Sequence, residues 1–124
     1  MAAIASTPFD PAFDAPAITS GGTAANAGGD TFTNKLGTRV YLNNGSGAPI
    51  NVTFVKGPAT VRPMGGLYGD VVNSNMVVAV PAGGIVEVAC PPGRFNPDGD
   101  PEGAVSMTYS DVTSLTVLVL TPSR

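Results

Sequence analysis

Apolar and polar residues alternate in short runs over most of the chain from Asp30 onward. A period of two is the pattern of a β-strand with one buried face. The clearest runs are residues 38–42, 50–55, 85–90, 105–109 and 114–120, with a short lead-in at 31–33 and a continuously apolar stretch at 76–80. The pattern therefore predicts six or seven strands.

Turn residues separate these runs. Asn44-Gly45 supplies positive φ at little steric cost, so residues 43–49 predict a β-hairpin between the runs at 38–42 and 50–55. Strands joined by hairpins, without helical crossovers, favour antiparallel pairing. The expected fold is all-β, an antiparallel β-sandwich of jelly-roll-like form over residues 28–124.

Residues 1–27 differ from the rest and predict an extended N-terminal arm. Prolines in this stretch break any helix, and pairs of glycines loosen the chain. Four large apolar residues recur at intervals of four or five, and we interpret them as anchors for a groove on another polypeptide: Ile4, Phe9, Phe13 and Ile18. By composition alone, the same stretch is equally typical of a disordered tail.

Two longer loops interrupt the strand pattern, at residues 57–75 and 94–103. The first is rich in glycine and proline and carries scattered apolar residues. Long loops of this kind commonly carry function. We therefore expect Met64, Leu67 and Tyr68 to add to the partner-binding surface of the arm.

Charge and hydropathy exclude two classes of partner. The net charge is −3, and the six cations lie singly along the chain, without the basic stripe that nucleic-acid binding requires. The longest apolar runs fall far short of the ~20 residues that span a bilayer. The first residues lack the basic and apolar regions of a secretory signal. We expect no nucleic acid and no membrane among the partners, and synthesis in a reducing cytoplasm.

The sequence contains few residues suited to catalysis or to binding a metal or cofactor. The sequence has no histidine, which excludes Ser–His–Asp and Cys–His catalysis and removes the commonest metal ligand. Cys90 lies in an apolar run without an adjacent cation, so we expect it to be buried rather than nucleophilic. The Gly-Gly pairs lack the spacing of phosphate-binding loops. We expect a protein that is not an enzyme and that holds no cofactor and no resident metal.

One acidic cluster leaves a hypothesis open. Asp98, Asp100 and Glu102 alternate as oxygen ligands do in some calcium loops. Tyr109 stands where an EF-hand loop has its bidentate glutamate, and flanking helices are not expected. A solvated turn is the simpler interpretation, with calcium binding as the alternative.

Several segments together resemble a known group of proteins. They are GGDTFTN at 28–34, TRVYLNNGSG at 38–47, PINVT at 49–53, VPAG at 80–83, and the ending at 103–121. The chain is similar over these stretches to small virion proteins of tailed bacteriophages, the capsid decoration or cement proteins. No single one of these motifs is diagnostic.

The resemblance implies a β-sandwich on the outer surface of the capsid. Its partner would be the major capsid protein, at local three-fold or two-fold junctions, with the decoration protein itself a homo-oligomer, often a trimer. It would be made in the host cytoplasm and located in the virion, where it holds neighbouring capsomers together.

A second function class stays open at this stage. A receptor- or glycan-binding module of a head or tail fibre would use exposed aromatic residues at loop tips. Tyr68 and Phe95 are the candidates, because the chain contains no tryptophan.

Overall fold

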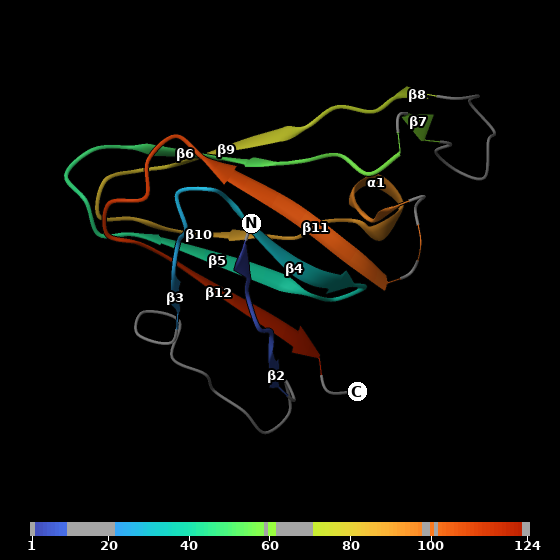
Figure 1. Ribbon diagram of the computed structural model, residues 1–124, viewed down its shortest axis with the longest axis horizontal. Coiled ribbons are helices and arrows are strands. Elements are labelled where there is room, and N and C mark those ends of the chain that lie inside the picture. The colour runs from blue at the N-terminus through green and yellow to red at the C-terminus, as the bar shows by residue number, and fades with distance from the viewer. Residues whose placement is uncertain are drawn as a thin grey trace.

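Almost all regular structure in the computed structural model is β-strand, arranged in two layers (Figure 1). The structure describes residues 2–9, 22–58, 60–61, 71–97, 100 and 102–122, with the backbone alone at positions 9, 61 and 71. Over these residues the predicted all-β sandwich is confirmed.

The first sheet has five strands, and its order differs from the order along the chain. The order is β1 (Ala2–Ala3), β4 (Asp30–Lys35), β11 (Glu102–Tyr109), β6 (Ile50–Phe54) and β9 (Met76–Val80). The pairs β4–β11, β11–β6 and β6–β9 are antiparallel, whereas β1 runs parallel to β4. The expected short lead-in at 31–33 is thus a six-residue strand inside this sheet.

The second sheet faces the first. Its order is β10 (Ile85–Val88), β5 (Arg39–Asn44), β12 (Leu115–Pro122) and β2 (Thr7–Phe9), with β3 (Thr23–Ala24) also pairing with β12. Strand β2 is parallel to β12 and the other pairs are antiparallel. Both sheets are therefore mixed, which corrects the prediction of purely antiparallel pairing, because the N-terminal segments add parallel strands.

The predicted hairpin at residues 43–49 is wrong. Strand β5 belongs to the second sheet and β6 to the first, so the segment between them crosses from one layer to the other. The turns at 81–84 and 110–114 also change sheet. Turn residues specify that the chain reverses, but they do not specify whether the next strand pairs with the previous one or packs against it.

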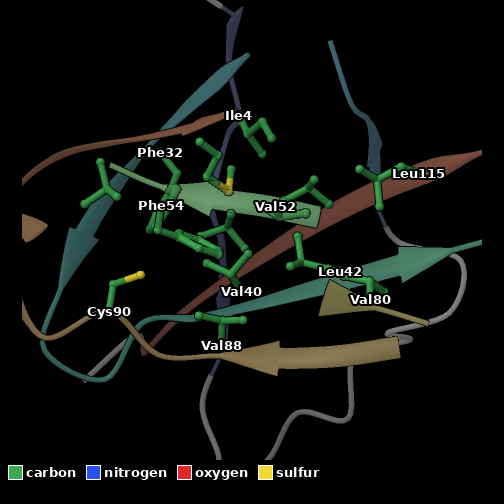
Figure 2. Packing of buried hydrophobic residues seen from close by; sticks show 14 of the residues in the cluster. Ile4, Phe32, Val40, Leu42, Val52, Phe54, Val80, Val88, Cys90 and Leu115 are labelled. Carbon is green, nitrogen blue, oxygen red and sulfur yellow. The ribbon is translucent and has the colours of Figure 1, made fainter. Parts of the chain in front are cut away.

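The core lies between the sheets and follows the alternation in the sequence (Figure 2). Burial alternates strictly along β5 and β6, and the inward residues are fully enclosed. The rings of Phe32 and Phe54 meet edge to face, with their centroids 6.4 Å apart. Each fully buried side chain of this size stabilises the fold by about 1.5–3 kcal/mol, and the core of this domain needs no disulfide.

One helix is present where a polar loop was expected. Helix α1 (Pro92–Phe95) is a single turn that begins at a proline, a residue suited to the first helical position. The turn directs Phe95 inward, where it is 1% exposed. Residues 92–96 are therefore part of the packed structure and not a solvated loop.

A small two-stranded sheet extends the first sheet outward. Strands β7 (Thr60–Val61) and β8 (Val71–Val72) pair antiparallel and continue the β6–β9 pair beyond its end. In Figure 1 this hairpin projects at the right-hand side of the molecule, on the side where α1 lies.

Candidate functional site

The structure describes two of the seven predicted partner-binding residues, Ile4 in full and Phe9 by its backbone in β2. The other five lie outside the described residues, and their roles stay predictions: Phe13, Ile18, Met64, Leu67 and Tyr68.

Ile4 serves the core of its own chain, which corrects its assignment as an anchor for another polypeptide. Its side chain is 5% exposed and belongs to the core cluster, at the margin seen in Figure 2. Its backbone N–H donates to the carbonyl of Thr31 at 2.8 Å, following the parallel pairing of β1 with β4. The described part of residues 1–27 thus adds strands to both sheets and closes one side of the sandwich.

We expect the substitution Ile4→Ala to lower the free energy of unfolding by about 2–3 kcal/mol, because it leaves a cavity between the sheets. Urea unfolding measures the change. Leu36→Ala is the matched control, since Leu36 is 85% exposed and its truncation leaves no cavity. Equal, small effects of the two substitutions would contradict the placement of Ile4 in the core.

Large apolar side chains are exposed at four described positions. Their exposed fractions are 85% for Leu36, 80% for Val72, 61% for Val77 and 39% for Ile85. Leu36 lies in the turn between β4 and β5, where Gly37 has φ +89°. Val72 lies in the projecting hairpin. None of the four was predicted as a partner-binding residue, because a period-two pattern does not reveal which face or edge another element covers.

The two most exposed of these residues lie at the same end of the sandwich, which we call the hairpin end. It comprises the 35–37 turn, α1, and the root of the β7–β8 hairpin at residues 55–58 and 73–75. Lys35 pairs in register with Glu102 at the start of β11, the strand that follows α1. The turn with Leu36 and the hairpin with Val72 are therefore both next to α1.

Buried asparagines hold the hairpin end together. Asn34 donates through Nδ2 to Asn96 Oδ1 and to the carbonyl of Cys90, both at 2.8 Å. Asn96 Nδ2 in turn donates to the carbonyls of Asn34 at 3.1 Å and Asp100 at 2.7 Å. Both side chains are 0% exposed. The network fixes α1 against β4, because a buried amide that loses its partners is costly.

A third asparagine fixes the projecting hairpin. Asn73, 4% exposed, donates through Nδ2 to the carbonyls of Pro58 and Arg94, both at 2.8 Å. Gly57 also donates its N–H to the Arg94 carbonyl at 2.9 Å. Both sides of the hairpin root are thereby bound to α1, so the base of the hairpin has a defined position on the sandwich.

The opposite end, which we call the corner end, has a different surface. It consists of the three sheet-crossing segments at residues 45–49, 81–84 and 110–114. They are linked by backbone hydrogen bonds from Asn44 to Gly84 and from Gly45 to Ser114, each 2.9 Å. Their residues are small or polar, apart from half-buried Val112. Ile85, 39% exposed, borders this end at the start of β10, whereas the two most exposed of the four residues, Leu36 and Val72, lie at the hairpin end.

Cys90 is buried as predicted, with 4% of its surface exposed. Burial raises the pKa of its thiol to about 12, with an opposing effect of the Arg94 charge. A thiol with this pKa is protonated at neutral pH and is a poor nucleophile.

Tyr109 and Asp30 form a second polar contact near the core. The Tyr109 hydroxyl donates to Asp30 Oδ2 at 2.6 Å. Burial, and then this hydrogen bond and the carboxylate charge, raise the pKa of Tyr109 well above its usual range. Asp30 Oδ2 also accepts the N–H of Asn26 at 3.1 Å. The Tyr109–Asp30 hydrogen bond joins β11 to β4, and the bond from Asn26 joins β4 to the segment that precedes it.

The acidic cluster is only partly described. Asp98 lies outside the described residues, and Asp100 and Glu102 are exposed. Within the described part of the chain, no group of three or more His, Cys, Asp or Glu residues is arranged to hold a metal ion. Calcium binding that involves Asp98 stays an untested hypothesis.

The prediction of Phe95 as an exposed aromatic is wrong. Its ring is 1% exposed, and the Arg94 guanidinium lies over it, 4.8 Å from the ring centroid. The other candidate for glycan binding, Tyr68, lies outside the described residues. Over the residues that are described, no pocket is found and no helix is long and apolar enough to cross a membrane.

Comparison of the chain with protein-family models, curated proteins and solved structures finds no match.

Proposed function

We propose that this chain is a non-enzymatic virion structural protein, a capsid decoration or cement protein that binds the outer surface of the major capsid shell and stabilises capsomer junctions. The observation that carries the proposal is the exposure of large apolar side chains at the hairpin end. There the two most exposed large apolar side chains of the described residues, Leu36 and Val72, stand on elements fixed to a buried polar network.

The physical reason is that cementing needs a rigid contact surface and not a reactive group. Exposed apolar side chains on ordered elements bind with little loss of conformational entropy. Many weak contacts on a repeating shell then add up through multivalency. Binding to the assembled shell, and not to its separated subunits, raises the stability of the shell by mass action.

The resemblance described from the sequence motifs supports the same proposal and supplies the partner, the major capsid protein. The predicted contacts Met64, Leu67 and Tyr68 lie outside the described residues, in the stretch of sequence between β7 and β8. In this proposal the hairpin carries the main contact to the shell. The protein acts in the virion after synthesis in the host cytoplasm.

The test measures binding of purified protein to expanded, undecorated heads and the temperature at which the heads come apart. We expect saturable binding and a higher disassembly temperature. Val72→Asp is expected to weaken binding at least about tenfold, because a carboxylate would be desolvated at the contact. Ala82→Asp, which adds the same charge at the exposed corner end, is the matched control and is expected to bind like the wild type.

Circular dichroism and unfolding curves of both variants establish that each is folded. Absence of binding by the wild-type protein would refute the proposed function. Equal binding by folded V72D and A82D variants would refute the role of the hairpin end.

A further inference from the structure

The outer strands of the two sheets differ in how they are protected. On one side, the N-terminal strands lie beside β4 and β12. On the other side lie β9 in the first sheet and β10 in the second. Strand β10 carries Glu87, whose Oε1 is 3.5 Å from Nε of Arg39. Natural proteins use such charges, or added segments, to prevent pairing of sheet edges with other chains.

Strand β9 has neither protection in the part of the chain that the structure describes. Its five residues, MVVAV, contain no charge, proline or glycine. It is the last strand of the first sheet and runs along the upper margin of the molecule in Figure 1. The adjacent strand β6 is uncharged as well. An uncharged, regular edge of this kind is a template for strand addition.

The direction of the backbone groups on β9 follows from the hydrogen bonds of β6. Asn51 accepts from the N–H of Ser110 at 3.0 Å, and Val55 donates to Ser106 at 2.9 Å, so the odd-numbered residues of β6 face β11. The even-numbered residues therefore face β9, where Val52 stands opposite Val78. It follows that Val77 and Ala79 direct their N–H and C=O groups away from β6, where no strand among the described residues pairs with them.

This edge is complementary to itself. In an antiparallel pair of two copies centred on Val78, Val77 of each copy stands opposite Ala79 of the other. Each such pair exchanges two N–H···O=C bonds, which gives four across the two-fold axis. Val77 and Ala79 also project from the outer face of the sheet, 61% exposed in the case of Val77, and would meet across the junction.

The inward side chains fit the same arrangement. Met76 and Val78 are only half-buried and pack at the margin of the core cluster. In the two-fold pair, Val78 meets its own copy in the closely spaced type of cross-strand contact. Apolar contacts on both faces then accompany the backbone bonds, without any charge to desolvate.

We infer that β9 is a homotypic interaction site, through which two copies of this chain pair edge to edge and join their first sheets into one continuous sheet. The occupant of the β9 edge is the β9 strand of a second copy. The inference does not depend on attachment to a capsid, and the two-fold pair differs from the trimer that the sequence resemblance implied.

Sedimentation equilibrium of the full chain, over concentrations up to the millimolar range, tests the inference. We expect reversible association to a species with twice the 12.4 kDa mass of the chain. Val77→Pro removes an outward N–H without removing a bond to β6, and proline is tolerated at such edge positions. The V77P substitution is expected to raise the dissociation constant of the dimer at least about tenfold. Val77→Thr, which keeps the N–H and the branched shape, is the control and should stay within about threefold of the wild type.

A double variant keeps the test decisive if V77P does not fold. V77K/A79K places lysines opposite one another across the junction and is expected to be monomeric, whereas V77T/A79T should still pair. A monomer at all concentrations, a trimer, or a dimer that persists in the folded V77K/A79K variant would overturn the inference. None of these outcomes bears on binding to heads, which is measured separately.

Discussion

Replacing Asn96 with aspartate is expected to lower the free energy of unfolding by about 3–5 kcal/mol at pH 7. The Asn96 amide donates to the carbonyls of Asn34 and Asp100. In N96D an oxygen takes the place of that donor, so two hydrogen bonds are lost and a buried charge faces two carbonyl oxygens. Chemical unfolding of wild type and variant at several pH values measures the difference.

The sign of the pH dependence is a further expectation for N96D. Burial without a cationic partner raises the pKa of the introduced carboxyl above its value in the unfolded chain. The folded variant then binds a proton more readily than the unfolded one, so its stability relative to the wild type rises as the pH falls. The protonated carboxyl also regains one donor.

Asn51→Asp provides the matched control for the same chemical change. Asn51 is exposed on the outer face of β6, where a carboxylate remains hydrated. N51D is expected to unfold much like the wild type, with no comparable pH dependence. If N96D were as stable as N51D at pH 7, the asparagine network at the hairpin end would not have the geometry described above.

Gly57→Ala is expected to lower the free energy of unfolding by about 3 kcal/mol, which corresponds to roughly 10 °C in melting temperature. A Cβ atom at position 57 would lie 2.1 Å from the carbonyl oxygen of Asn96 and 2.9 Å from the carbonyl carbon of Phe95. These are backbone atoms, which cannot rotate away as a side chain does. The hairpin root or α1 must shift, and the hydrogen bond from Gly57 to Arg94 is strained or lost.

Gly93→Ala is the control on the other side of this contact. Gly93 is in α1, and a Cβ there would meet nothing within 4 Å. Alanine also restricts the unfolded chain, so G93A is expected to be neutral or to stabilise the protein by about 0.5 kcal/mol. Thermal unfolding followed by circular dichroism compares the two variants. Similar melting temperatures would contradict the close approach of the hairpin root to α1.

These two predictions concern adjacent contacts of α1: N96D tests the contact of α1 with β4, and G57A tests the contact of the hairpin root with α1. Under the proposed function, a folded variant with a displaced hairpin root is expected to lose head binding before it loses the sheets. Binding measured on G57A below its melting temperature would therefore report on the hairpin end separately from overall stability.

The alternating pattern determined the all-β class, the strands β5, β6, β10, β11 and β12, and the inward faces of β5 and β6, whereas β7 and β8 fall in the predicted 57–75 loop. It did so because alternate residues of a strand lie on opposite faces, and only one of those faces could be buried. The burial of Cys90 followed for the same reason. Composition alone excluded Ser–His–Asp and Cys–His catalysis, because the sequence has no histidine.

Pairing was decided only by the tertiary structure. Asn44 and Gly45 reverse the chain whether the next strand pairs with β5 or crosses to the other sheet, and the crossing is stabilised by contacts with Gly84 and Ser114, far away in sequence. Ile4 looked like an exposed anchor because nothing local reveals a gap between two sheets. Two further features depend on elements that meet only in the fold: the network of Asn34, Asn73 and Asn96, and the edge of β9, which is unpaired among the described strands. A sequence pattern shows which residues can be buried, but it does not show which elements bury them.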